Sequence, residues 1–152
     1  MAISEDIFRA YDIRGIVETA LTPEAVTRIG QAFATEARAR GQNKVVIGRD
    51  GRLSSPDLAH ALSDGLRAGG CDVIDVGMVP TPVLYYATHK LNTGTGIMVT
   101  GSHNPPQYNG LKMMVAGNTF YGDDIKSLYQ RIIDGNIDNG DGDYQQQDLI
   151  PD

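Results

Sequence analysis

The sequence predicts a three-layer α/β/α domain built on a mixed four-stranded sheet that is mostly parallel. Short Gly-bounded runs rich in Val and Ile alternate along the chain with segments whose apolar residues recur at helical spacing. Such alternation gives right-handed crossovers and a parallel sheet with helices on both faces. One further apolar run follows its neighbour too closely for a crossover, and this predicts a single antiparallel strand.

Four segments show the helical spacing. Three of them begin with a Ser or Thr followed by proline, a pair that suits the N-cap and the first helical position, at Thr22–Pro23, Ser55–Pro56 and Thr81–Pro82. The first helix ends before Gly41. The fourth runs from about Asp123 to a stop at Gly135.

The apolar runs between these helices are expected to be buried strands. Three of them are bounded by glycine and lie at Lys44–Gly48, Asp72–Gly77 and Gly96–Thr100. The last run, Leu111–Val115, follows the third after about ten residues, whereas a parallel crossover needs a dozen or more. We therefore expect 111–115 to run antiparallel to its neighbours.

The length of 152 residues suits one domain with a real core. We expect residues 1–135 to form this domain. Residues 136–152 lose all periodicity and are polar and acidic, so they are expected to be a linker or tail.

Composition excludes several classes of function. With 13 Lys+Arg against 19 Asp+Glu and no basic stripe, the chain has no electrostatic footprint for nucleic acid. No stretch approaches the roughly 20 apolar residues that span a bilayer, so no membrane insertion is expected. Cys71 is the single cysteine, and the first residues lack the basic-then-apolar run of a signal peptide, which predicts a cytoplasmic protein.

Polar segments follow three of the predicted strands, at residues 49–52, 80–82 and 101–104. The carboxyl ends of parallel strands meet at one edge of the sheet, and ligands of open α/β sheets bind at that edge. We therefore look for the chemistry there.

The segment Thr100–Lys112 is the densest in polar and turn-forming residues. Asn109–Gly110 is expected to form a tight turn that brings Lys112 back toward Ser102 and so places a hydroxyl beside cations. The alternative is that Ser102 and Asn104 only hydrogen-bond a turn, as such residues do in many loops.

Asp50 lies between Arg49 and Arg52 at a strand end. These charges form either a network that shapes the site or an exposed ion-pair cluster that contributes little, and the sequence leaves both open. Neither nucleotide-binding fingerprint is present, and the serine at 102 lacks the flanking glycines of a nucleophile elbow.

Four segments together resemble the α-D-phosphohexomutase family in sequence, order and spacing: FRAYDIRG (8–15), GRDGRLSSP (48–56), VGMVPTPVLYYA (76–87) and TGSHNPPQYNGLK (100–112). The chain is most similar to the N-terminal domain of the bacterial phosphomannomutase/phosphoglucomutase branch. The resemblance extends over nearly the whole sequence.

The resemblance implies that Ser102 carries a phosphoryl group and is a metal ligand, coordinating Mg²⁺ through its phosphate. The implied reaction interconverts hexose 1-phosphates and 6-phosphates of glucose or mannose through a 1,6-bisphosphate, with glucose 1,6-bisphosphate as activator. A metaphosphate-like transition state needs cations around its oxygens and a proton acceptor near the sugar hydroxyl.

The resemblance also implies roles for the neighbouring residues. Lys112 matches a general acid/base, Arg14 and His103 are catalytic cations, and Tyr11 and Arg14 line the sugar cleft. Three further residues are expected to support the loop, namely Asn104, Asp50 and Arg49.

Members of this family have four domains, and the acidic metal loop and the sugar-recognition loop belong to the later ones. The Mg²⁺ is therefore expected to be shared with a second domain that this sequence lacks. The expected partners are hexose phosphates and the remaining domains, and the isolated domain is expected to be inactive. The alternative is a module that only binds a phosphate, a sugar phosphate or another chain.

Overall fold

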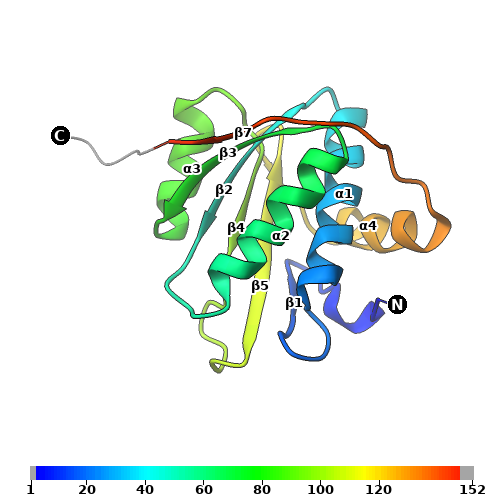
Figure 1. Ribbon diagram of the computed structural model, residues 1–152, viewed down its shortest axis with the longest axis vertical. Helices are drawn as coiled ribbons and strands as arrows, with labels where there is room; N and C mark the ends of the chain where they lie inside the picture. The colour runs from blue at the N-terminus through cyan, green and yellow to red at the C-terminus, as the bar shows by residue number, and fades with distance from the viewer. Residues whose placement is uncertain (1–2, 148–152) are drawn as a thin grey trace.

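A computed structural model describes residues 3–147 and shows a twisted sheet with helices on both faces (Figure 1). In chain order the elements are a 3₁₀ turn Glu5–Ile7, β1 Ile13–Ile16, α1 Pro23–Ala39, β2 Lys44–Arg49, α2 Ser55–Ala68, β3 Asp72–Met78, α3 Thr81–Lys90, β4 Gly96–Val99, β5 Tyr108–Val115, β6 Asn118–Thr119, α4 Asp123–Asp134 and β7 Tyr144–Gln146. The expected α/β/α fold class is confirmed.

The sheet has the strand order β1-β5-β4-β2-β3-β7, with β6 paired to β5. The pairs β2–β3, β2–β4 and β3–β7 are parallel, and β5 is antiparallel to β1, β4 and β6. All strands except β5 therefore run in one direction. The antiparallel strand expected at 111–115 is confirmed, and it begins earlier, at Tyr108.

The expected number of four strands is wrong, because the sheet has seven. β1 is only four residues long and carries Arg14 and Gly15 among its residues, so it lacks the Val- and Ile-rich run of a buried strand. β6 has two residues, and β7 consists of exposed polar residues at the sheet edge.

Residues 136–152, expected to be a linker or tail, contain one short strand that joins the sheet. Tyr144–Gln146 pair with β3 as the parallel edge strand β7. Their pairing uses backbone hydrogen bonds, which leave no apolar pattern in the sequence. Residues 148–152 of the expected tail lie outside the described residues.

The helix ends follow from local chemistry. The Thr22 side chain accepts a hydrogen bond from the Ala25 N–H at 3.2 Å, and α4 ends at a left-handed Gly135, both as expected. The expected caps of α2 and α3 are one residue off, since Ser54 and Pro80 precede these helices. The Ser55 hydroxyl is bonded elsewhere, as described below.

Helices α1, α2 and α4 cover one face of the sheet and enclose the larger apolar cluster, whereas α3 covers part of the other face. Helices α1 and α2 lie side by side across the front of Figure 1. Glycines permit this close approach, since a Cβ on Gly65 would lie 2.1 Å from the Thr27 carbonyl oxygen. None of the helices within residues 3–147 is long and apolar enough to cross a membrane.

Helix α3 packs on β2 and β4 and leaves the β1–β5 part of its face uncovered. Arg14 on β1 pairs with Gly110 on β5, and Lys112 lies two residues further along the same strand. Because side chains alternate between faces, Arg14 and Lys112 share this face. Two half-buried cations thus mark the uncovered part of the sheet.

Candidate active site

The loop between β4 and β5, residues 100–107, projects from the carboxyl end of β4. Its chain reverses through backbone bonds from the Asn104 N–H to the Gly101 carbonyl and from the Tyr108 N–H to the Pro105 carbonyl, both 3.0 Å. The tight turn expected at Asn109–Gly110 is wrong, because both residues lie inside β5. Pairing with β1 and β4 extends β5 backward through a dipeptide that otherwise favours turns.

Ser102 lies on the exposed part of this loop with a φ of +51°. A non-glycine residue in the left-handed region is uncommon and is held there only by its surroundings. Its own N–H donates to the Thr100 hydroxyl at 3.1 Å. The loop therefore presents the Ser102 hydroxyl to solvent in a constrained orientation.

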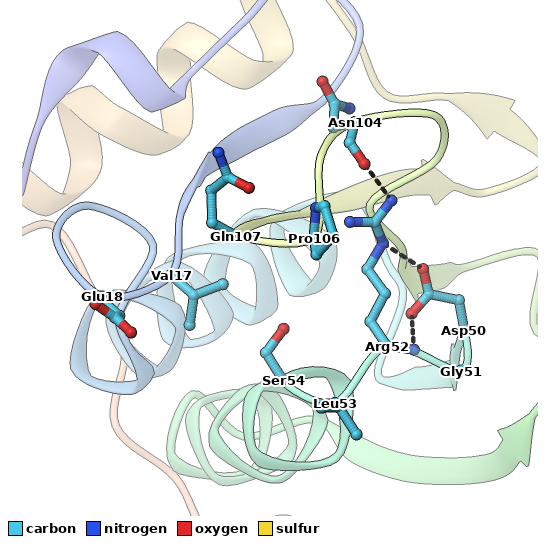
Figure 2. A pocket seen from close by; sticks show the side chains of 10 residues that line it. All are labelled: Val17, Glu18, Asp50, Gly51, Arg52, Leu53, Ser54, Asn104, Pro106 and Gln107. Atoms are coloured by element: carbon cyan, nitrogen blue, oxygen red, sulfur yellow. Dashed lines mark hydrogen bonds and ion pairs between the residues drawn. The ribbon is translucent and has the colours of Figure 1, made fainter.

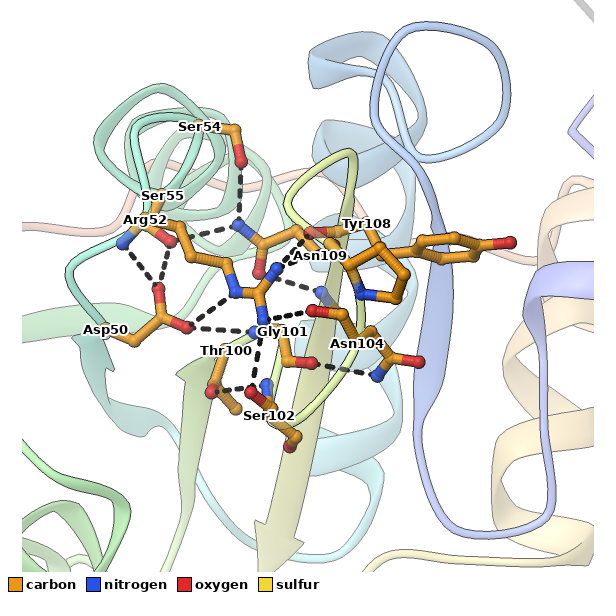
Figure 3. Close-up of polar contacts among 12 residues, drawn as sticks. Asp50, Arg52, Ser54, Ser55, Thr100, Gly101, Ser102, Asn104, Tyr108 and Asn109 are labelled. Carbon is orange, nitrogen blue, oxygen red and sulfur yellow. Dashed lines mark hydrogen bonds and ion pairs between the residues drawn. The ribbon is translucent and has the colours of Figure 1, made fainter.

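Asp50, in the turn after β2, fastens this loop to the neighbouring strand end (Figure 3). One carboxylate oxygen accepts from the Gly101 N–H at 2.9 Å, and the other accepts from the Ser55 hydroxyl and from the Arg52 N–H. Burial raises the pKa of Asp50, but these hydrogen bonds outweigh burial and hold the pKa below its ordinary value. Asp50 therefore belongs to a network that shapes the site, the first of the two alternatives left open by the sequence.

The Arg52 side chain extends from the turn after β2 into the loop between β4 and β5. Its guanidinium donates to four backbone carbonyls, those of Ser102 (3.1 Å), Asn104 (2.7 Å), Pro105 (2.8 Å) and Tyr108 (3.2 Å). Sequence reasoning identified this arginine only as a neighbour of Asp50. Its role was missed because contacts with backbone carbonyls leave no signature in the residue types.

Arg14 is brought to the loop by β1. Its guanidinium pairs with the buried Asp12 carboxylate at 2.8 Å and approaches the Asn104 side-chain oxygen at 3.5 Å. Lys112 lies on the same face of the sheet, opposite Met98 on β4, the strand that leads into the loop. The structure thus gathers Ser102, Arg14, Lys112 and Asn104 around one corner of the sheet.

Three other expected site residues lie outside this network. His103 is exposed beside Ser102 in the loop, and Tyr11 is 74% exposed and stacks on Tyr121 with ring centroids 6.1 Å apart. Arg49 is directed away from the loop, because its closest acidic partner is Asp75 on β3 at 3.9 Å. We therefore assign Arg49 no contact with the loop.

Asn109 is a supporting residue that sequence reasoning missed. It is fully buried, and its side-chain amide donates to the hydroxyls of Ser54 and Ser55, each at 2.9 Å. These bonds tie β5 to the start of α2. The sequence signal was present, but Asn followed by Gly favoured the turn interpretation.

An open pocket of about 610 Å³ lies behind the loop (Figure 2). It is lined by the turn after β1, the turn after β2 and the outer side of the loop, with Arg52 forming part of its wall. Ser102 is not among its lining residues.

Within residues 3–147, no group of three or more His, Cys, Asp or Glu side chains is arranged to hold a metal ion. An oxygen on Ser102 is exposed and accessible to a hard cation such as Mg²⁺, which prefers oxygen ligands and keeps several waters. Chemically, the site presents one constrained hydroxyl beside two half-buried cations.

The comparisons with known proteins agree with this geometry. Residues 5–137 match the family "Phosphoglucomutase/phosphomannomutase, alpha/beta/alpha domain I". The chain is 52% identical over 145 residues to a phosphomannomutase/phosphoglucomutase of Pseudomonas aeruginosa, covering 95% of this chain and 31% of the relative. It is 50% identical over 127 residues to a phosphoglucomutase of Neisseria meningitidis serogroup B, covering 84% and 28%.

Solved structures give the same result. A phosphoglucomutase/phosphomannomutase family protein from Burkholderia thailandensis superposes with a TM-score of 0.92 at 49% identity, covering 97% of this chain and 34% of that one. A phosphomannomutase-like structure from Thermus thermophilus gives 0.81 at 33% identity, with coverage of 93% and 33%. The chain spans about a third of the length of these relatives. It belongs to the phosphoglucomutase/phosphomannomutase family and corresponds to the α/β/α domain I of that family.

Proposed function

We propose that this chain is the phosphoryl-carrying domain of a phosphohexomutase that interconverts the 1-phosphates and 6-phosphates of glucose or mannose through a 1,6-bisphosphate. The observation that carries the proposal is Ser102, an exposed hydroxyl held at φ +51° on a loop anchored by Asp50. A strained, exposed nucleophile at the carboxyl end of a strand is typical of a reacting group.

In the proposed reaction, the bond between phosphorus and the Ser102 Oγ breaks as a sugar hydroxyl oxygen bonds to the same phosphorus. The sugar hydroxyl gives its proton to a general base, the role that we propose for Lys112, and the leaving Ser102 oxygen takes up a proton; the reverse transfer runs these proton movements backward. Arg14 places positive charge, and His103 a hydrogen-bond donor, near the phosphoryl oxygens, where negative charge accumulates in a metaphosphate-like transition state. Tyr11, exposed on the turn before β1, lines the approach of the sugar.

Mg²⁺ fits the proposal as an ion shared between chains or domains. The phosphorylated Ser102 would supply one oxygen ligand, and when bound the ion would neutralise charge on the transferring group. Its other ligands would come from a second domain.

The relatives are about three times as long as this chain. We propose that further domains supply the sugar contacts, that residues 1–135 form the phosphoryl-carrying unit with 136–152 leading toward the next domain, and that this unit alone turns over negligibly. Glucose 1,6-bisphosphate would load Ser102 and so act as activator. The protein would work in the cytoplasm, where sugar phosphates and Mg²⁺ are available.

A second candidate is a module that binds a phosphate without transferring it. One observation favours it: the Asn104 side-chain amide donates to the Gly101 carbonyl at 2.8 Å and so acts as an ordinary turn-forming residue. The same cations would then hold a phosphate near an unreactive Ser102.

The experiment that separates the candidates measures the intact mass of the chain after incubation with glucose 1,6-bisphosphate and Mg²⁺, with separately expressed later domains of the P. aeruginosa relative added. We expect a gain of one phosphate, mapped to Ser102 by fragmentation. The variant S102A should gain none, and the control S127A, on the exposed face of α4, should match the parent. A folded parent chain that gains no phosphate would leave only the binding module.

A further inference from the structure

We propose that Arg52 is the positioning residue of the phosphoryl-carrying loop: it holds the backbone of residues 102–108 so that the Ser102 hydroxyl stays aimed at the reacting phosphoryl group. This inference rests on the proposed function for its effect on rate. The loop geometry that it explains is independent of that function.

The hydrogen bonds of the Arg52 guanidinium all point into one loop. The guanidinium Nη2 donates to the carbonyls of Ser102 and Asn104, and Nη1 donates to those of Pro105 and Tyr108 (Figure 3). One planar group with five fixed donors thereby satisfies four carbonyls of a single loop. A lysine ammonium has three donors on one nitrogen and cannot reproduce this spread.

Arg52 and the loop also fit closely together. A Cβ built on Gly101 would lie 2.1 Å from both Cζ and Nε of Arg52, so the loop backbone rests directly against the guanidinium. The Nε side faces the Asp50 carboxylate at 3.4 Å, and that carboxylate also holds the Gly101 N–H. The arginine is therefore fixed on one side and fixes the loop on the other.

Ser102 itself is restrained on both sides of its Cα. Its N–H is held by the Thr100 hydroxyl and its carbonyl is held by Arg52, so both peptide groups flanking its Cα are oriented by hydrogen bonds. These two restraints oppose the relaxation of Ser102 from φ +51° to the ordinary negative region. Without Arg52 the direction of the Cα–Cβ bond, and with it the position of Oγ, would change.

The surrounding space makes the inference testable by chemical rescue. Arg52 forms part of the wall of the open pocket behind the loop, and Figure 2 shows its side chain extending from that wall toward Asn104. Truncation to alanine would leave a space that is continuous with the pocket and therefore with solvent. A free guanidinium ion is small enough to enter and can donate to the same carbonyls.

The test uses a chimera in which this chain replaces the matching 31% of the P. aeruginosa relative. Four forms are compared: the parent, R52A, R52K and R67A. Arg67 is the matched control, since it is a half-buried arginine on α2 whose Nε donates to the Gly142 carbonyl at 3.0 Å, away from the loop.

We expect R52A to lower kcat about 100-fold while KM for the hexose phosphate stays within about twofold, because misplacing a reacting atom by about 1 Å has an effect of this size. Guanidinium at tens of millimolar should raise the kcat of R52A about tenfold. The kcat of R52K should lie between those of R52A and the parent, and the kcat of R67A should match that of the parent. Amide exchange at residues 101–104 should quicken in R52A and remain slow in R67A.

Two results would overturn the proposal. One is a kcat for R52A within about threefold of that of R67A. The other is a loss of kcat that guanidinium does not reverse, together with faster amide exchange over the whole domain. If the parent chimera gains no phosphate on Ser102, the proposed function fails instead. The exchange rates at residues 101–104 then still decide whether Arg52 holds the loop.

Discussion

Replacing Gly101 by alanine tests the contact between the loop and Arg52 through stability alone. The φ of Gly101 is not in the left-handed region, so an alanine meets no backbone strain there. Its Cβ would nevertheless lie 2.1 Å from two guanidinium atoms of Arg52, whereas ordinary contacts begin near 3.4 Å. The guanidinium must therefore move by more than 1 Å.

The size of the effect follows from the bonds that this movement breaks. The four carbonyl bonds of Arg52 measure 2.7–3.2 Å, and a displacement of more than 1 Å away from the loop removes them. A hydrogen bond from a charged donor is worth about 1.5–3 kcal/mol, but the Arg52 side chain is 18% exposed and water replaces part of each bond. We therefore count less than 1 kcal/mol for each bond and expect G101A to lower the free energy of unfolding by about 3 kcal/mol.

The assay is a double-mutant cycle by urea unfolding, followed by circular dichroism on the 152-residue chain. R52A alone should lower the free energy of unfolding by a similar ~3 kcal/mol, because the same four hydrogen bonds disappear. In the R52A background the three atoms closest to the alanine Cβ are gone, so G101A should then change stability by less than ~0.5 kcal/mol. The coupling energy between the two sites should accordingly be about 3 kcal/mol.

Additive effects of the two substitutions would refute this reasoning, because the alanine would then destabilise the loop by a route that does not involve Arg52. A suitable control is G51A. A Cβ on Gly51 finds only the Met78 sulfur at 3.7 Å, so this substitution should change stability by less than ~0.5 kcal/mol in either background.

Three further predictions concern the packing and the network. G65A should destabilise the chain by about 2 kcal/mol by urea unfolding, since overpacking against the Thr27 carbonyl exceeds the ~1 kcal/mol that alanine gains in a helix; a gain in stability would contradict this. N109A should lower the free energy of unfolding by about 2–3 kcal/mol and quicken amide exchange at the start of α2, because two hydrogen bonds to serine hydroxyls are lost. Unchanged amide exchange would contradict this prediction. Asp50 has a folded pKa below its ordinary 3.8, so the parent should have a higher Tm than D50N, and this difference should be fully present above about pH 4. The difference in Tm should disappear as the pH falls lower; a difference that grows on acidification would contradict the prediction.

The parts of the fold that the sequence predicted are those in which burial sets the residue pattern. The strands β2, β3 and β4 carry Val and Ile at their buried positions, and α1 carries an apolar stripe between a capping Thr22 and Gly41. The strands that were missed are held by backbone pairing at the sheet edges. β1 contains Arg14 because its outer face is uncovered, and β7 is polar because it is exposed.

The missing strand β1 also bears on the error at Asn109–Gly110. The Asn–Gly dipeptide by itself favours a tight turn, and nothing in the expected four-stranded sheet paired with it. In the structure, β1 pairs with the first half of β5, and Asn109 is buried against the start of α2. A strand register that depends on a second strand cannot be read from either one alone.

The cations of the site divide into two groups by what they already bind. The guanidinium donors of Arg52 already have partners, since they face four loop carbonyls and the Asp50 carboxylate. Arg14 has one close partner in Asp12, and its second contact, to Asn104, is long at 3.5 Å. Lys112 lies half-buried on the same face.

This division has an electrostatic consequence. In a chain with a net charge of −6, a phosphate on Ser102 would add close to two further negative charges at one loop. Arg52 cannot compensate them without releasing the loop, so the compensation falls to Lys112 and to the Nη1 side of the Arg14 guanidinium, which makes only the long contact with Asn104. The loop and the charge that would stabilise its phosphate are therefore supported by different residues, and a substitution at Arg14 should weaken phosphate binding while the loop keeps its conformation.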